Sequence, residues 1–308
     1  MKGMNIRRAG YLGLVGLVLI ASLVLSSCAP RPVGATGTEI VEAKDVAGLL
    51  GQANTVLVDA RGLMDYRDGH IPGAVNIPRP DIVVMTPFPA MLAPSEKIAQ
   101  TMGSRGINNQ TLVVVYDDNQ MDAARLWWTL KVYGHDNVKV VSGGIDALVR
   151  AGFELTTTAP TIQPATFNPG PLRQEMLVEA FEIRSHVNEP RADVVLIDTR
   201  SEEEHFNGHI PGSNHMEYLV NYFRDKTFRP VNHIRIMYLE QGIDYQKEVW
   251  LYCHTSIRAA PTFLALYNAG YRNIRLYDGA WVQWSANPLN PVYVPEVETM
   301  QLRSSDQS

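Results

Sequence analysis

Short apolar runs alternate with amphipathic segments along most of the chain. The runs are four or five residues long, are rich in β-branched side chains and are bounded by polar residues. They lie at 55–58, 111–115, 138–141, 194–197, 249–252 and 274–277. Such runs are typical of strands that are buried on both faces of a sheet, and their alternation with helices favours parallel pairing. The pattern therefore predicts an α/β fold with mainly parallel sheets flanked by helices.

The second half of the chain repeats motifs of the first half. A strand end with the sequence Asp-x-Arg at 59–61 returns at 198–200, and a Gly-His-Ile-Pro-Gly turn at 69–73 returns at 208–212. Both repeats stand 139 residues further on, and later in each copy the matching glycines stand 136 residues apart. One nearly constant offset is typical of a duplicated domain.

A segment rich in Thr and Pro separates the two copies. Residues 156–173 have no apolar period, which is typical of an extended linker. We therefore expect one domain at 37–155 and a second at 174–308. The length of 308 residues agrees with two domains, and a content of 45% apolar and 19% charged residues is ordinary for a protein with a packed core.

The beginning of the chain has the features of an export signal. Basic residues at 2, 7 and 8 precede an uncharged apolar run at 11–25. Fifteen residues are few for a helix that spans a bilayer, which needs about 20, but they suit the apolar region of a secretion signal. A plain signal peptide and a short membrane anchor are both compatible with this pattern.

The end of the apolar run resembles the lipobox of bacterial lipoproteins. Leu-Ser-Ser-Cys at 25–28 is followed by Ala29. The resemblance implies a signal peptide at 1–27, lipid attachment at Cys28 and a tether at 28–36. Because Ala and not Asp follows the cysteine, it also implies a cell-envelope protein on the outer membrane, facing the periplasm, if the source has two membranes.

Charge bears on the partners of the protein. The formal charge is −5 for the whole chain and −8 without residues 1–27. An acidic chain disfavours a nucleic-acid partner. It also means that attachment to a membrane would depend on lipid and not on a basic patch.

Cys253 is the main candidate for chemistry. The chain has two cysteines, so lipidation of Cys28 would leave Cys253 without a disulfide partner. Cys253 follows a predicted strand and precedes a predicted helix that ends before Gly270, so it faces a helix N-terminus. With Arg258 nearby, we expect a depressed pKa and a thiolate near neutral pH, whereas the alternative is an inert buried cysteine.

Together these motifs resemble the rhodanese sulfurtransferases in their tandem two-domain form. The resemblance rests on both repeated motifs, on Tyr-Cys followed by four residues and Arg-Ala at 252–259, and on Tyr-Asp-Gly-Ala-Trp at 277–281. It covers nearly all of the chain after the signal, in both copies. It implies two tandem rhodanese-like domains, each a mainly parallel sheet flanked by helices.

The resemblance also implies a reaction. Cys253 would take sulfane sulfur from thiosulfate or 3-mercaptopyruvate as a persulfide and pass it to a thiophilic acceptor such as cyanide or a thiol. No metal or organic cofactor is needed. Backbone N–H groups of the loop would stabilise the sulfur anion. The implied loop and substrate-binding residues are His254, Thr255, Ser256, Ile257 and Arg258.

The loop departs from the family pattern in one position. Ser256 stands where the family has Gly, which predicts a change in loop geometry or in the rate of sulfur transfer because Ser resists left-handed backbone angles. The loop matches neither Cys-Arg-Lys-Gly of thiosulfate enzymes nor Cys-Gly-Ser/Ala-Gly of mercaptopyruvate enzymes, so the donor stays open. Four residues separate Cys253 from Arg258. Cysteine phosphatases have five residues between their Cys and Arg, so a phosphatase is the less favoured interpretation.

The first copy lacks this chemistry. Asp117 stands at the place of Cys253, in an acid-rich stretch at 117–122. A carboxylate cannot carry sulfane sulfur, so we expect a catalytically silent domain that packs against the second and forms one wall of the cleft. A rival hypothesis for the whole chain is a non-catalytic module that carries sulfur or binds a partner.

Histidines of the second copy could suggest a zinc site. They are His205, His209, His215 and His254. His209 has a counterpart in His70 of the silent copy. The Asp-x-Arg motif also occurs in both copies. Features that both copies share are expected to fix the strand end and the turn, and we expect no metal ligation.

Overall fold

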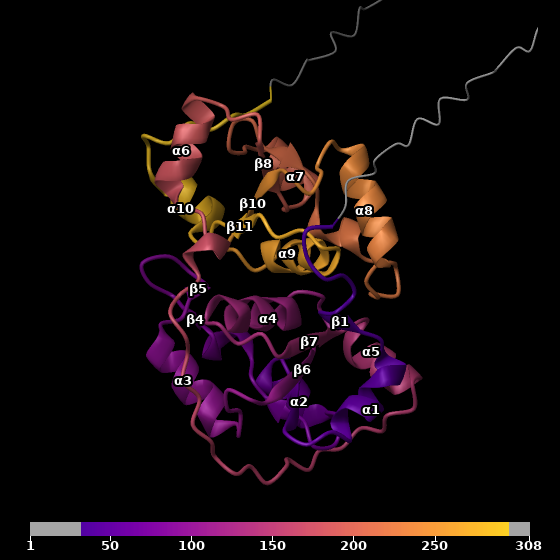
Figure 1. The fold of residues 1–308 in the computed structure, drawn as a ribbon. Helices are drawn as coiled ribbons and strands as arrows, with labels where there is room; N and C mark the ends of the chain where they lie inside the picture. The colour runs from indigo at the N-terminus through magenta and orange to yellow at the C-terminus, as the bar shows by residue number, and fades with distance from the viewer. Residues whose placement is uncertain (1–31, 296–308) are drawn as a thin grey trace, which may run out of the picture. The chain divides into compact units, whose positions relative to one another are not determined.

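The first domain is built on a parallel sheet. The computed structural model describes residues 32–295, and within them this sheet has the strand order β1-β7-β6-β2-β3 (Figure 1). Its strands are β1 (Ile40–Val41), β2 (Thr55–Asp59), β3 (Val75–Asn76), β6 (Leu112–Tyr116) and β7 (Val138–Val141). Its helices are α1 (Val46–Leu50), α2 (Leu63–Asp68), α3 (Ser95–Ser104), α4 (Asp122–Val132) and α5 (Gly144–Arg150). A short antiparallel pair, β4 (Val83–Val84) and β5 (Met91–Leu92), stands apart from the sheet.

The second domain repeats this plan. Its described strands form a parallel sheet in the order β11-β10-β8-β9. They are β8 (Val194–Asp198), β9 (Asn214–His215), β10 (Glu248–Tyr252) and β11 (Ile274–Leu276). The helices are α6 (Ala180–Asn188), α7 (Glu202–Phe206), α8 (Val231–Glu240), α9 (Ala259–Asn268) and α10 (Ala280–Ala286). The 3-10 helices of the two domains are η1 (Ala43–Asp45), η2 (Arg79–Asp81), η3 (Gln174–Met176) and η4 (Tyr218–Asn221).

The six apolar runs are all strands, with bounds that agree to within one residue. The prediction succeeds because strands inside a parallel sheet bury both faces and therefore need uninterrupted apolar sequence. The edge strands β1, β3 and β9 are two residues long, as are β4 and β5. So short a run has no period, and the pattern did not predict them.

The strand-end motif has the same role in both domains. The carboxylate of Asp198 pairs with Arg200, whose Nη2 donates to the carbonyl of Gly208 at 2.8 Å. In the first domain, Asp59 and Arg61 make the equivalent bonds to each other and to the carbonyl of Gly69. The Asp-x-Arg motif thus ties the end of a strand to the Gly-His-Ile-Pro-Gly turn, which confirms the structural role expected for it.

Helices α4 and α9 pack against each other and join the cores of the two domains (Figure 1). Every residue of α4 is buried, because the sheet covers one side and α9 covers the other. The ring of Trp127 lies 6.1 Å from that of Phe263 and 5.4 Å from that of Tyr267, between ring centroids. The expected packing of the first domain against the second is confirmed.

A buried ion pair crosses this contact. Arg125 of α4 is fully buried, and its Nη2 donates to Oδ1 of Asp278 at 2.9 Å. The backbone N–H of Leu92 donates to the other carboxylate oxygen of Asp278 at 2.7 Å. Because a buried charge is costly unless it is paired, this carboxylate ties two elements of the first domain to the end of β11 in the second.

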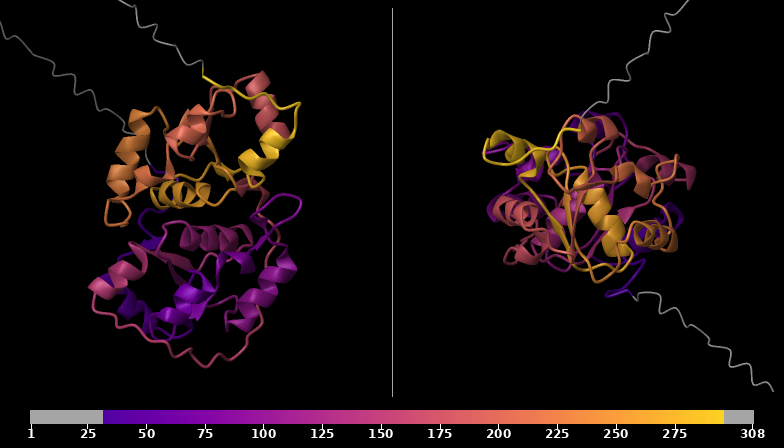
Figure 2. Two further views of the ribbon diagram at one scale, coloured as in Figure 1. Left: turned by 180° about the vertical axis from the view of Figure 1, so that it is seen from behind. Right: turned by 90° about the horizontal axis from the view of Figure 1, so that it is seen from above.

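The expected linker and the described part of the expected tether both make hydrogen bonds to the domains. Residues 157–173 contain no helix or strand, and they run along the surface of the first domain (Figure 2). Along this linker, the N–H of Gly170 donates to the carbonyl of Tyr133 at 2.8 Å. Residues 32–36 of the expected tether are not free, because the N–H groups of Val33 and Gly34 donate to the carbonyl that Gly270 presents beyond α9.

The predicted signal peptide at 1–27 and the lipid attachment residue Cys28 lie outside the described residues. Over 32–295, the structure contains no helix whose length and apolar character would let it cross a bilayer.

Candidate active site

Cys253 lies at the carboxyl end of β10, between the flanking strands β8 and β11. Its side chain is fully buried. Its carbonyl accepts a hydrogen bond from the N–H of Trp281, and the carbonyl of His254 accepts one from Val282. Hydrogen bonds from the first turn of α10 thus hold the start of the loop between β10 and α9 in place. The predicted placement of Cys253 between a strand end and a helix N-terminus is confirmed.

Two opposing effects act on the thiol of Cys253. Burial raises its pKa, and this effect is the largest. The positive charge of Arg258 and the backbone N–H groups of Thr255, Ala259 and Arg258 favour the thiolate and act in the opposite direction. The net result is a pKa above the ordinary value for a cysteine. The expectation of a depressed pKa is therefore wrong, because the sequence pattern indicated the stabilising groups and not the complete removal of water.

The guanidinium of Arg258 is bound by a carboxylate that sequence reasoning missed. Its Nη1 and Nη2 donate to the two carboxylate oxygens of Glu204, at 2.5 and 2.7 Å. Ser201 also donates to Glu204, from its backbone N–H at 3.2 Å and from its hydroxyl at 3.1 Å. Chiefly through the Arg258 contact, these bonds lower the pKa of Glu204 to about 2. The Ser-x-x-Glu capping signal at 201–204 could have identified the helix start, but not the partner 54 residues away.

Ser256 has a left-handed backbone conformation, which Gly adopts more readily than Ser does. Its φ is +63°, in the left-handed region. Its hydroxyl donates to Oδ1 of Asp278 at 2.9 Å, the same oxygen that accepts from Arg125. The expected change in loop geometry or in the rate of sulfur transfer stays a prediction. A charge-assisted hydrogen bond offsets the strain that a side chain brings there.

The other predicted loop residues have different surroundings. His254 is half exposed, and its Nδ1 lies 3.9 Å from the carboxylate of Glu204. Thr255 is partly exposed, and its N–H group acts on the thiol of Cys253. Ile257 is buried in the apolar core.

The loop of the first domain is the structural counterpart of this loop. Asp117 follows β6 as Cys253 follows β10, and Gln120 has a φ of +65°, like Ser256. The carboxylate of Asp117 accepts a hydrogen bond from the N–H of Ala123 at 3.0 Å, and burial raises its pKa to about 6. The two loops thus share a left-handed residue four positions after the strand but differ in the group at their start.

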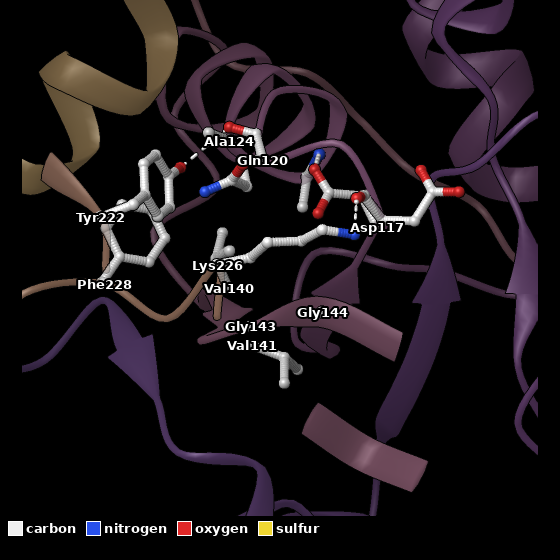
Figure 3. A pocket seen from close by; sticks show the side chains of 12 residues that line it. Asp117, Gln120, Ala124, Val140, Val141, Gly143, Gly144, Tyr222, Lys226 and Phe228 are labelled. Atoms are coloured by element: carbon white, nitrogen blue, oxygen red, sulfur yellow. Dashed lines mark hydrogen bonds between the residues drawn. The ribbon is translucent and has the colours of Figure 1, made fainter. Parts of the chain in front are cut away.

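Side chains of the second domain fill the space beside Asp117 (Figure 3). Tyr222 donates from its hydroxyl to the carbonyl of Gln120 at 2.8 Å. Lys226 donates from Nζ to the carbonyl of Asp118 at 3.0 Å. The remaining cavity is about 10 Å³, which is about the space for one water molecule.

Three histidines of the second domain have ring nitrogens within hydrogen-bond distance of protein atoms. Nδ1 of His205 lies 2.9 Å from the carboxylate of Asp198, and Nδ1 of His209 lies 2.9 Å from the carbonyl of His205. Nε2 of His215 lies 2.9 Å from the carbonyl of Arg200. Within 32–295, no group of three or more His, Cys, Asp or Glu side chains is arranged to hold a metal ion.

Comparisons with known proteins agree on the family. A model described as "Rhodanese-like domain" matches residues 42–151 and again residues 180–287. A 3-mercaptopyruvate sulfurtransferase of Escherichia coli K12 is 29% identical over 254 residues, which cover 76% of this chain and 88% of that protein. The sulfur carrier protein TtuD of Thermus thermophilus is 30% identical over 241 residues, with coverage of 71% and 83%. A thiosulfate sulfurtransferase of Azotobacter vinelandii is 28% identical over 265 residues, with coverage of 82% and 96%.

A solved structure has the same fold. EanB, in a persulfide form with ergothioneine, superposes with a TM-score of 0.76. The match covers 84% of this chain and 71% of EanB, at 24% sequence identity. The expected tandem arrangement of two α/β domains with mainly parallel sheets is confirmed.

Replacing Ser256 should separate backbone strain from hydrogen bonding. Ser256→Ala keeps the left-handed strain and loses the bond to Asp278, whereas Ser256→Gly loses the bond and relieves the strain. We expect the alanine variant to be less stable than the glycine variant by about 1 kcal/mol. Urea unfolding of both variants measures the difference. Equal stabilities, or a more stable alanine variant, would show that the angle carries no strain.

The thiol of Cys253 should titrate above the usual range for cysteine, about 8.5. In a chain carrying Cys28→Ser, the 13C signal of the Cys253 β-carbon reports its protonation directly. Arg258→Met should move the midpoint to higher pH, because it removes the positive charge that favours the thiolate. Arg191→Met, at an exposed arginine of the same domain, is the matched control and should leave the midpoint in place. A parent midpoint below 8.5 would contradict the burial effect.

Proposed function

Because the chain belongs to the rhodanese family, with two rhodanese-like domains in tandem, we propose that it is a sulfurtransferase whose Cys253 carries sulfane sulfur as a persulfide. The observation that carries the proposal is the surroundings of this thiol. It stands at a strand end, and the N–H groups of Thr255, Arg258 and Ala259 act to stabilise its anion. A row of N–H groups with a nearby cation suits a sulfur anion better than it suits an inert thiol.

The reaction has two half-reactions that both use the same sulfur atom. The thiolate of Cys253, formed by loss of the thiol proton to solvent, attacks the outer sulfur of thiosulfate. The S–S bond breaks, and sulfite leaves with the electron pair. With 3-mercaptopyruvate the C–S bond breaks, and the pyruvate enolate leaves and takes up a proton. A nucleophile such as cyanide or a thiolate then attacks the outer sulfur of the persulfide and regenerates the Cys253 thiolate.

The choice of donor has support only from the relatives. Two of the similar proteins are named for 3-mercaptopyruvate and for thiosulfate. The proposal therefore names both as donors, with cyanide or a thiol as the acceptor. The site as proposed uses no metal or organic cofactor, because the attacking group, the anion-stabilising N–H groups and the leaving group complete the chemistry.

A sulfur carrier is the second candidate. Two observations favour it, the complete burial of Cys253 and the raised pKa of its thiol, since both slow attack on a donor. A relative at 30% identity also carries the name sulfur carrier protein. In this case the persulfide would form and persist until a specific partner thiol removed it.

We further propose that the mature protein is held on a membrane by lipid at Cys28. Support comes from the sequence alone, namely the apolar run at 11–25 and the Leu-Ser-Ser-Cys site at 25–28. More than one acyl chain is needed for stable anchoring, which a lipoprotein cysteine would supply. The envelope, and the periplasmic face of an outer membrane in a two-membrane source, is the proposed location.

Cys253 should be required for sulfur transfer. Incubation of the protein with thiosulfate or 3-mercaptopyruvate should add one sulfur at Cys253, detected by mass spectrometry, and cyanide should remove it as thiocyanate. Cys253→Ser should reduce thiocyanate formation to background, because no other group in the loop can hold sulfane sulfur. A persulfide that forms but that cyanide and small thiols fail to discharge would favour the carrier. Failure to form it with either donor would overturn the proposed enzyme.

Cys28 should determine membrane attachment. In a bacterial host, the full chain should partition into the detergent phase and should incorporate labelled fatty acid. Cys28→Ser should abolish both, because the attachment atom is lost, while Cys253→Ser serves as the control and should change neither. Labelled fatty acid on the Cys28→Ser chain would contradict the anchor.

A further inference from the structure

The arginine whose charge acts on the thiol of Cys253 is bound by a carboxylate. Arg258 is the only Lys or Arg in the loop from Cys253 to Arg258, and its charge acts on the thiol. Both of its terminal nitrogens donate to Glu204. A two-point contact through Nη1 and Nη2 occupies one of the two edges by which a guanidinium binds a carboxylate or a sulfonate.

The structure holds Glu204 in this position from its own side as well. It lies in the first turn of α7, and the backbone and hydroxyl of Ser201 both donate to it. About a third of its side chain is exposed, so an incoming anion can reach the ion pair. The carboxylate is thus placed in advance, and an anionic donor has to compete with it for Arg258.

The arginine that follows the neighbouring strand β8 is itself paired. Arg200 pairs with Asp198 at 2.6 Å, and its side chain is almost completely buried. With Glu204 ionised, the charges of Glu204 and Arg258 cancel. A donor with two negative charges therefore gains less from the site than it would gain from a free guanidinium, and it meets more repulsion from the carboxylate than a donor with one.

We propose that Glu204 is a specificity-determining residue, which competes with the anionic group of the donor for Arg258 and so disfavours dianionic sulfur donors relative to monoanionic ones. This inference rests on the proposed function and deepens it. Thiosulfate, a dianion, is the disfavoured class. Thiosulfonates with one charge, and 3-mercaptopyruvate through its single carboxylate, are the favoured class.

Two sulfur donors that react through the same type of bond, but differ in charge, isolate the effect of charge. Thiosulfate and methanethiosulfonate both deliver their outer sulfur by cleavage of an S–S bond, with sulfite or methanesulfinate as the leaving group, but they carry two charges and one. In the wild-type chain with cyanide as acceptor, we expect a KM for methanethiosulfonate that is lower by about tenfold or more. This arm needs no variant, so it tests the inference even if a substitution prevents folding.

The variant Glu204→Gln removes the charge and keeps an oxygen that can accept from Ser201. We expect its KM for thiosulfate to fall by about tenfold, with kcat changed by less than about twofold and with a smaller fall for methanethiosulfonate. The matched control is Glu203→Gln, which removes an exposed carboxylate from the same turn of α7 and should leave both KM values unchanged. A purely structural role for Glu204 would instead lower kcat or stability and leave the preference between donors as it is.

The outcomes separate this inference from the proposed function. Turnover with both donors, but equal KM values in the wild type or a thiosulfate KM that Glu204→Gln leaves unchanged or raises, overturns the role of Glu204 alone. A chain that forms no persulfide at Cys253 with any donor overturns the proposed function, and this inference with it.

Discussion

The carboxylate of Asp278 connects the parts of the molecule on which the site depends. It accepts hydrogen bonds from Arg125 and Leu92 of the first domain and from Ser256 of the active loop. Arg125 is completely buried, so its charge requires a partner inside the protein. The same partner holds the left-handed residue of the loop. The first domain therefore has a physical part in shaping the site, although it contributes no group that could carry sulfur.

The pKa of Cys253 follows from a balance of opposing effects. Removal of water disfavours the thiolate, while the loop N–H groups and Arg258 favour it. Glu204 neutralises Arg258 and so reduces its attraction for any further anion near the sulfur. The site is consequently less electropositive than a loop with one arginine and no acid suggests. Burial of the Cys253 thiol and the ion pair of Arg258 with Glu204 both act on the reactivity of the thiol.

Duplication has preserved the backbone and changed the chemistry. The left-handed angle occurs at Gln120 and at Ser256, and the strand-end ion pair occurs in both copies. The space beside Asp117 is filled by side chains of the second domain, including Lys226. The loop of the first copy therefore packs against the second domain.

The α/β class, the duplication and the six longer strands could be predicted from the sequence, because buried parallel strands need continuous apolar runs and both copies keep the strand-end motif. The position of Cys253 followed from the same local signals. Tertiary structure alone decided the rest. Glu204 reaches Arg258 from 54 residues away, and Asp278 reaches Arg125 from 153 residues away. Local sequence reports which groups stand near the thiol along the chain, whereas its pKa depends on how completely distant segments exclude water and which distant charges they bring.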